Sequence, residues 1–301
     1  MNEVALQVKS LTKEFGSLTA VDNLSLEVYR GEIFGFLGPN GAGKTTSIRM
    51  MCGLLEPDSG EVIFQGGKLV GICPQETILW EKLTCLEQLE FIGEMYNLPA
   101  KLARQRGDEL LSILGLEEKR HNLASTLSGG MKRRLNLALA LIHDPEILVL
   151  DEPEAGLDPQ SRLLVREYIR SLAQKKTIIL TTHNMDEAER MADRVAIIDH
   201  GKLLVTDTPE ALKRTIGEGD VLEIEILSIP VEQALAIIQP DFPDIQVEGN
   251  NYFIRAGGIM EKMSSLFDAI KKAGGEIGEV HLRANTLEDV FISLTGRRLR
   301  Q

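Results

Sequence analysis

The sequence contains few cysteines and no long apolar segment. Its three cysteines, Cys52, Cys73 and Cys85, lack the paired spacing of a metal site and suggest no disulfide framework, so we expect reduced thiols as in a cytosolic protein. No apolar run approaches the roughly 18 residues that a membrane-spanning helix needs, and the N-terminal MNEVALQVKSLTKEF lacks the pattern of a signal peptide. If the protein serves a membrane, we expect it to act from outside the bilayer.

Positive charge is also scarce. The chain has 33 lysines and arginines against 45 aspartates and glutamates, a formal net charge of −12. Such a balance argues against broad, salt-sensitive binding to nucleic acid, so we expect no nucleic-acid partner. The 301 residues are enough for one large domain and one small domain, or for two mid-sized domains.

The first two thirds of the chain alternate short β-branched runs with longer helical patterns. This alternation predicts an α/β fold in which helices cover a sheet. The predicted strands are Gly31–Leu37, Glu61–Phe64, Ile147–Leu150, Thr177–Thr181 and Arg194–Asp199. The predicted helices are Thr45–Cys52, Cys85–Tyr96, Lys101–Leu114, Gly130–Ile142, Pro159–Lys175 and Met185–Met191. The stretch from about 76 to 126 is mostly helical, and we interpret it as an inserted helical subdomain.

The pattern changes at the proline and glycines between residues 208 and 220. The segments that follow predict a strand (VLEIEIL), a helix (PVEQALAIIQ), a hairpin (DIQVEGNNYFIRAG), an amphipathic helix (GIMEKMSSLFDAIKKAGG), a strand (EIGEVHLRA) and a closing helix (TLEDVFISLTGRR). The order β-α-β-β-α-β is typical of a ferredoxin-like arrangement. We therefore expect a small α+β domain over residues 217–301, in which Met260, Met263 and Phe267 are core positions rather than a ligand site.

A glycine-rich segment, GPNGAGKT, lies between an apolar strand and a helix. Glycines allow backbone N–H groups to turn inward around phosphate oxygens, and the helix points its positive end at the same anion. Lys44 is placed to reach the β- and γ-phosphates, and the Thr45 hydroxyl to bind Mg²⁺. Nucleotide binding is favoured over a purely structural turn. The expected nucleotide-binding positions are Gly38, Pro39, Asn40, Gly41, Ala42, Gly43, Lys44, Thr45 and Thr46.

Two acidic residues, Asp151 and Glu152, end the apolar run ILVL. Taken alone, such a pair more often starts a helix. Beside a phosphate-binding loop, carboxylates at the end of a strand lie where α/β sheets bind ligands. Asp151 can then hold Mg²⁺ through water, and Glu152 can act as the general base for the attacking water.

The segment LSGGM opens a helix with Ser128 as its expected N-cap and two glycines behind it. With the preceding motifs, this segment resembles the signature sequence of the ABC ATPase family. The resemblance covers residues 4–215 and implies the family's fold: a P-loop NTPase with a RecA-like core, a β-subdomain and the helical insert, here as a domain over residues 1–216. It also implies that Ser128, Gly129 and Gly130 contact the γ-phosphate bound by the opposite subunit of a homodimer.

The same resemblance assigns further positions. Gln75 matches the Q-loop, which touches Mg²⁺ and the water. Asp158 in Gly-Leu-Asp matches the D-loop at the dimer interface, His183 matches the switch histidine that holds the γ-phosphate, and Phe15 matches the aromatic residue that stacks on adenine. The expected catalytic residues are thus Glu152, His183 and Gln75, and the expected metal ligands are Thr45, Gln75 and Asp151. The other histidines, at 121, 143, 200 and 281, match no motif.

Two departures from the general family pattern are visible. Met131 occupies a position that is glutamine in many members, and LSGGMKRRL with the tail TLEDVFISLTGR resembles the branch of daunorubicin-resistance exporters, whose permease is a separate chain. The basic triplet Lys132, Arg133 and Arg134 is part of this resemblance; the alternative interpretation is that it forms a solvated helix face. The stretch from residue 60 to 75 is shorter than usual, with a possible tight turn at Gly66-Gly67, so either the β-subdomain is trimmed or a loop is missing.

These features predict an ATP-binding and hydrolysing subunit, with ATP and Mg²⁺ as cofactors, that forms a homodimer and drives a separate membrane permease. We expect it to be cytoplasmic and peripheral at the inner face of the cell membrane. Export is favoured over import, because the tail of this chain does not have the pattern of the barrel-like regulatory tail expected of an importer subunit. A soluble ABC ATPase of translation or DNA repair is disfavoured by the single cassette and the lack of sustained heptads. A non-hydrolysing sensor is disfavoured by the presence of both Glu152 and His183.

Overall fold

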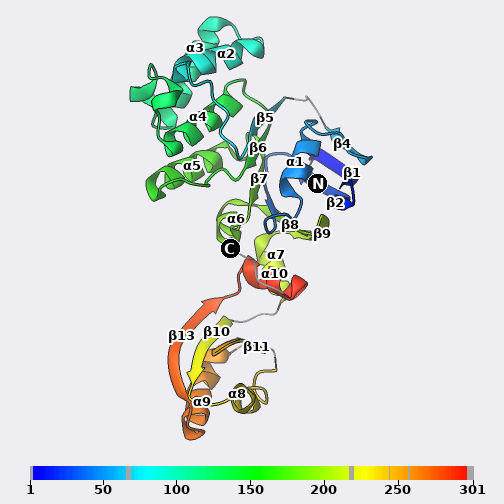
Figure 1. The fold of residues 1–301 in the computed structure, drawn as a ribbon, viewed down its shortest axis with the longest axis vertical. Coiled ribbons are helices and arrows are strands. Elements are labelled where there is room, and N and C mark those ends of the chain that lie inside the picture. The colour runs from blue at the N-terminus through cyan, green and yellow to red at the C-terminus, as the bar shows by residue number, and fades with distance from the viewer. Residues whose placement is uncertain (1–2, 66–68, 217–219, 244, 257, 297–301) are drawn as a thin grey trace. The chain divides into compact units, whose positions relative to one another are not determined.

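The computed structural model describes residues 3–65, 69–216, 220–243, 245–256 and 258–296. The chain forms two compact units that divide between Pro209 and Glu210 (Figure 1). Each unit has its own buried apolar core. The sequence placed the boundary after Ile216, at the far end of helix α7 (Pro209–Thr215).

A six-stranded sheet with the order β5-β6-β7-β3-β8-β9 organises the first unit. Its strands are β3 (Ile33–Leu37), β5 (Val70–Cys73), β6 (Ile147–Asp151), β7 (Thr177–Thr182), β8 (Arg194–Asp199) and β9 (Lys202–Asp207). Neighbours are parallel except β9, which pairs antiparallel with β8. Every residue of β3, β6 and β7 is buried, since a parallel sheet covered on both faces requires strands that are apolar on both sides.

The register of this sheet brings three loops to one edge. Leu37 at the end of β3 pairs with Thr182, and Asp151 at the end of β6 pairs with Thr181. The chain therefore leaves β3, β6 and β7 at the same place, the carboxyl edge where open α/β sheets bind ligands.

A second, antiparallel sheet with the order β2-β1-β4 forms the β-subdomain. Its strands are β1 (Val4–Phe15), β2 (Leu18–Tyr29) and β4 (Ser59–Phe64). It shares a core with the central sheet and with helix α1 (Lys44–Met51). The chain thus sends β4 into this sheet and β5 into the central one, while the expected turn at Gly66-Gly67 lies outside the described residues.

The remaining helices of the first unit lie on the other side of the central sheet, some against the sheet itself and some farther out in the helical subdomain (Figure 1). They are α2 (Cys85–Met95), α3 (Ala100–Ile113), α4 (Gly129–Leu141), α5 (Pro159–Leu172) and α6 (Met185–Met191), with 3-10 turns at Glu117–Lys119 and Ala124–Thr126. Helix α2 begins in a capping box in which Thr84 and Glu87 bond each other's backbone N–H groups, the arrangement that stabilises a helix start. None of the helices in the described ranges has the length and apolar character needed to cross a bilayer.

The predicted strands and helices of this unit are confirmed within two residues at each end, with one exception. Helix α5 ends at Leu172 rather than Lys175, because Ala173 is extended and Gln174, at φ 67°, donates its N–H to the carbonyl of Gly31. Strands β1, β2, β5 and β9 were missed. In β1, register shifts near Ser10, at φ 49°, break the alternation by which a strand is recognised.

The second unit contains a four-stranded antiparallel sheet with the order β11-β12-β10-β13. Its elements are β10 (Asp220–Leu227), α8 (Val231–Ile238), β11 (Ile245–Glu248), β12 (Asn251–Ala256), α9 (Ile259–Lys272), β13 (Glu276–Ala284) and α10 (Leu287–Thr295). One face of the sheet packs against α8 and α9. The elements follow each other in the predicted order.

Candidate functional site

The glycine-rich segment connects β3 to α1. Gly41 and Gly43 have φ values of 81° and 99°, which only glycine adopts readily. A Cβ at Gly43 would also overlap the carbonyl of Ala20, and one at Gly38 would overlap that of Ile198. Helix α1 starts at Gly43 with no side-chain cap, so its first N–H groups are available to an anion.

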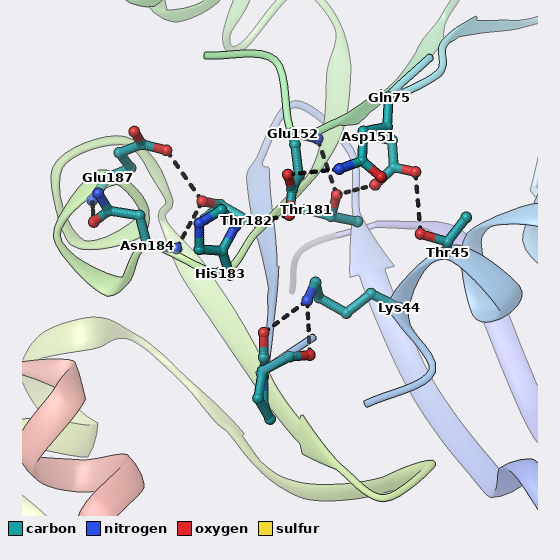
Figure 2. A network of polar contacts seen from close by, with 12 residues as sticks. Lys44, Thr45, Gln75, Asp151, Glu152, Thr181, Thr182, His183, Asn184 and Glu187 are labelled. Carbon is teal, nitrogen blue, oxygen red and sulfur yellow. Dashed lines mark hydrogen bonds and ion pairs between the residues drawn. The ribbon is translucent and has the colours of Figure 1, made fainter. Parts of the chain in front are cut away.

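Lys44 lies inside this loop, with only 7% of its surface exposed. Its ammonium donates hydrogen bonds to the carbonyls of Gly38 at 2.7 Å and Pro39 at 3.0 Å (Figure 2). Burial lowers the pKa of Lys44, while the charges of Glu152 and Asp151 oppose that shift. The loop therefore encloses a positive charge within reach of two carboxylates.

Asp151 ends β6 and is buried. One carboxylate oxygen accepts a hydrogen bond from the hydroxyl of Thr45 at 3.3 Å, and the other accepts one from the hydroxyl of Thr181 (Figure 2). Three oxygen-bearing side chains, those of Thr45, Asp151 and Thr181, thus meet beside the glycine loop. Among the described residues, no three His, Cys, Asp or Glu side chains gather as a ready-made metal site.

Glu152 has an unusual backbone conformation, with φ at 50°. Its N–H donates to both the carbonyl and the hydroxyl of Thr181, each at 3.1 Å. Gln75 donates through Nε2 to one carboxylate oxygen at 2.9 Å, and His183 Nδ1 lies 2.8 Å from the other (Figure 2). The three expected catalytic residues therefore converge on one carboxylate.

Hydrogen bonds of its neighbours hold the loop that carries His183. The hydroxyl of Thr182 donates to Glu187 at 3.0 Å and accepts the N–H of Asn184 at 2.9 Å. Asn184 in turn caps α6 by accepting the N–H of Glu187. The imidazole itself remains about half exposed, at 53% of the side chain, so one side of it faces outward.

A cavity of about 450 Å³ lies beside these groups. It is lined by Phe15, Leu18, Thr19, Ala20, Asn40, Gly41, Gly43, Lys44, Thr45, Thr46, Gln75, Glu152, His200 and Gly201. Nothing in the sequence pattern pointed to residues 18–20 or 200–201. Residues 18–20 begin β2, and residues 200–201 form the β8–β9 turn. The fold holds this turn against the glycine loop, with the N–H of Gly201 bonded to the carbonyl of Ala42.

The other predicted positions lie at helix starts. Ser128 caps α4 by accepting the N–H of Met131 at 3.3 Å, and Gly129 and Gly130 form the first turn. Asp158 caps α5 and accepts the N–H groups of the second and third residues after it. Within the described chain, Ser128, Gly129, Gly130 and Asp158 do not line the cavity.

The solvated-face alternative for the basic triplet is wrong for Arg133. This side chain is buried, with 5% of the residue exposed, and it donates hydrogen bonds to the backbone carbonyls of Gln75 and Glu152. Arg134 also bonds backbone carbonyls, those of Leu114 and Gly115. The side chain of Arg133 is the main functional candidate that the sequence did not reveal.

The central parallel sheet, the glycine loop after β3 and the acidic pair after β6 define a phosphate-loop nucleoside triphosphatase. A family model described as ABC transporter matches residues 21–155. The Nod factor export ATP-binding protein I of Ralstonia nicotianae is 41% identical, over 98% of this chain and 95% of its own. The daunorubicin resistance ATP-binding protein DrrA3 of Streptomyces coeruleorubidus is 37% identical, over 100% and 99%.

Among solved structures, a dimeric ATP-binding cassette in a post-hydrolysis state, bound to ADP and phosphate, superposes with a TM-score of 0.62. It is 25% identical, and the match covers 67% of this chain and 98% of that one. The chain belongs to the ABC transporter family, in which it is an ATP-binding protein of the export branch that hydrolyses ATP for transport. This agrees with the predicted export subunit rather than with an importer subunit or a soluble ATPase.

Proposed function

We propose that the chain binds ATP and Mg²⁺ in this cavity and hydrolyses ATP as one half of a head-to-tail homodimer. Each half would drive a separate permease from the inner, cytoplasmic face of the membrane. The observation that carries the proposal is the convergence of Gln75 and His183 on the Glu152 carboxylate, next to the loop that holds Lys44.

The loop from Gly38 to Thr46 is proposed to bind the phosphates. The donors are the backbone N–H groups of the residues that follow Pro39, from Asn40 to Thr46, which include the start of α1. The ammonium of Lys44 exchanges two carbonyl acceptors for β- and γ-phosphate oxygens, which are stronger acceptors because they are charged. Phe15 lines the same cavity, and we assign it to stack on the adenine.

The side chains near Asp151 fit Mg²⁺. A hard cation prefers oxygen ligands and keeps much of its water, so it needs few protein groups. Thr45 and Asp151 offer oxygens within hydrogen-bond distance of each other, and the amide oxygen of Gln75 is the third proposed ligand. When bound there, Mg²⁺ would offset the negative charge that develops on the phosphates during hydrolysis.

Hydrolysis is proposed to use Glu152 as the general base. A water proton passes to the Glu152 carboxylate, the water oxygen bonds to the γ-phosphorus, and the bond to the β–γ bridging oxygen breaks as ADP leaves. Gln75 and His183 hold the two carboxylate oxygens, which keeps the base aimed at one position. The outward side of His183 is free to contact the γ-phosphate.

The homodimer is proposed from the start of α4. A Cβ added at Gly129 would meet no atom of this chain within 4 Å, and Gly129 does not have a positive φ, so the fold itself does not require glycine there. Close approach of a group from outside the chain does explain it. We assign that group to the γ-phosphate held by the second subunit, contacted by Ser128, Gly129 and Gly130, with Asp158 at the interface. The related dimeric cassette supports this arrangement.

The permease is proposed to dock on the helical subdomain, residues 76–126. Trp80 and Phe91 are 43% and 46% exposed and pack edge to face, with ring centroids 5.4 Å apart, and the nearby Ile78 is also exposed. Exposed apolar groups of this kind mark interaction surfaces. The patch begins a few residues after Gln75, so a movement of the permease can be transmitted through the backbone to Gln75 and from there to the Glu152 carboxylate.

The C-terminal domain, residues 217–301, is proposed to be ferredoxin-like and to stabilise or regulate the dimer, with residues 1–216 as the ATPase domain. The β-α-β-β-α-β order and the antiparallel sheet with two helices on one face support the ferredoxin-like assignment.

The test is the mass in solution of the Glu152→Gln variant, measured by light scattering with and without ATP and Mg²⁺. Removal of a general base slows hydrolysis by about 10²–10⁴-fold, so bound ATP accumulates and monomer shifts to dimer. Adding Ser128→Arg fills the space at the start of α4 and should abolish the shift while ATP still binds. If ATP binds to Glu152→Gln and the mass never changes, the proposed contact across the dimer is wrong.

A further inference from the structure

We infer that Arg133 is a positioning residue that fixes the backbone under Gln75 and Glu152 and thereby aims their side chains. The inference rests on the roles proposed above for these two residues. It adds a third, buried group that touches neither ATP nor the water.

The guanidinium of Arg133 bonds two chain segments at once. NH1 donates to the carbonyls of Pro74 at 2.6 Å and Gln75 at 2.7 Å. NH2 donates to the carbonyls of Asp151 at 2.5 Å and Glu152 at 2.7 Å, and Nε makes a longer bond, 3.5 Å, to Pro153. These contacts occupy all five donors of the guanidinium.

The two segments are the ones that carry the catalytic side chains. Pro74 and Gln75 follow β5, and Asp151 to Pro153 end and follow β6, its parallel neighbour in the sheet. The side chains of Gln75 and Glu152 also bond each other at 2.9 Å. Arg133 therefore anchors the backbone at both ends of the hydrogen bond that orients the base.

Glu152 needs such an anchor. At φ 50°, a residue with a Cβ is in a sparsely populated conformation that persists only when its surroundings hold it. Thr181 holds the N–H of Glu152 on one side, and Arg133 holds its carbonyl on the other. Loss of either contact lets the peptide rotate and moves the carboxylate away from the water.

Arginine is suited to this task in a way that lysine is not. In the described structure, every hydrogen bond of Arg133 ends on a backbone carbonyl, so the side chain acts as a planar five-donor fork rather than as half of an ion pair. Lysine offers only three donors from a single point. A lysine at 133 can therefore hold one segment but not both.

Arg133 also extends from the second turn of α4, the helix that Ser128 caps and Gly129 begins. A shift of that helix when a second subunit binds is passed by the guanidinium to both catalytic segments together. The buried fork thus joins the proposed dimer contact to the proposed base.

The test compares steady-state hydrolysis of ATP·Mg²⁺ by the full chain with Arg133→Gln, Arg133→Lys and the matched control Lys132→Gln. We expect Arg133→Gln to lower kcat about 10- to 100-fold, the size of effect that a small misplacement of reacting groups produces. The Kd for ATP, from a fluorescent analogue, should stay within about threefold. Arg133→Lys should fall between, and Lys132→Gln, one residue away on the same helix, should match the original chain. A thermal melt of each variant shows whether it folds.

A double-mutant cycle with Glu152→Gln separates positioning from general support. If Arg133 acts through Glu152, its replacement in the Glu152→Gln chain should lower the residual rate far less than in the original chain. Equal losses in both chains, a loss confined to ATP affinity, or unchanged kcat in Arg133→Gln would overturn the inference. If Glu152→Gln itself hydrolyses ATP at the original rate, the proposed function fails instead, and the two failures are distinguishable.

Discussion

Phe15 is a half-exposed aromatic side chain on the cavity wall, at the end of β1, with the ammonium of Lys13 5.7 Å from its ring centroid. An apolar ring left open to water beside a phosphate loop is suited to stack on a base. Alanine substitution of a stacking aromatic costs about 1–3 kcal/mol per base, so we expect Phe15→Ala to raise the Kd for ATP by about 5- to 150-fold with little change in kcat.

Equilibrium binding of a fluorescent ATP analogue measures this change. Leu54→Ala is the control, since Leu54 is also apolar and exposed but does not line the cavity. Because every base has a π-face, GTP binding should weaken in parallel. Unchanged affinity in Phe15→Ala would place the adenine elsewhere.

Residues whose chemistry depends on their chain neighbours were predictable from the sequence. Lys44, Asp151 and Glu152 each follow a recognisable strand, and the sheet register then brings them together. Arg133 was not predictable, because its environment is built from carbonyls of two distant loops and carbonyls have no side-chain signature. The same holds for His200 and Gly201, whose turn meets the cavity only through the tertiary fold.

The start of α10 is held by several hydrogen bonds and ion pairs. Asp289 completes a capping box with Thr286 and forms ion pairs with Arg283 and Arg255. Burial raises its pKa, but the hydrogen bonds from Arg283 and Thr286 outweigh that effect and lower the pKa from 3.8 to about 2. A carboxylate with a depressed folded-state pKa stabilises the fold above its unfolded pKa and loses that contribution as the pH falls through the folded value.

We therefore expect Asp289→Ala to weaken α10 by about 2 kcal/mol at pH 7, from a shift of nearly two pKa units at about 1.4 kcal/mol each. In the original chain the same contribution should persist to about pH 4 and disappear between pH 4 and pH 2. Hydrogen exchange of the amides of residues 287–295 at pH 7 reports the loss locally. Glu288→Ala, at the exposed neighbouring position, is the control; equal protection in both variants would contradict the assignment.

Elements with strict periodicity were predicted well, and those with irregular pairing were not. Helix α9 matches its predicted segment closely, because its apolar residues keep the helical period throughout. Strand β5 was missed since four residues are too few to show a pattern, although the central sheet fixes it firmly against β6.

The whole molecule consists of two units with separate cores, and every residue that lines the cavity belongs to the first. We therefore expect a chain shortened after Ile216 to bind ATP with unchanged affinity. If the C-terminal domain stabilises the dimer, the shortened Glu152→Gln chain should need a higher protein concentration to dimerise with ATP. Sedimentation equilibrium of both lengths measures this. An unchanged dimer constant together with an unchanged ATPase rate would exclude both the stabilising and the regulatory role.

The left-handed conformation of Glu152 has a consequence for how this chain can evolve. Glycine or asparagine would occupy position 152 with less strain, so drift toward a more stable protein leads away from glutamate there. If Glu152 is the proposed general base, retaining glutamate requires continued selection for turnover. A descendant released from that selection would gain thermal stability at this position while losing hydrolysis.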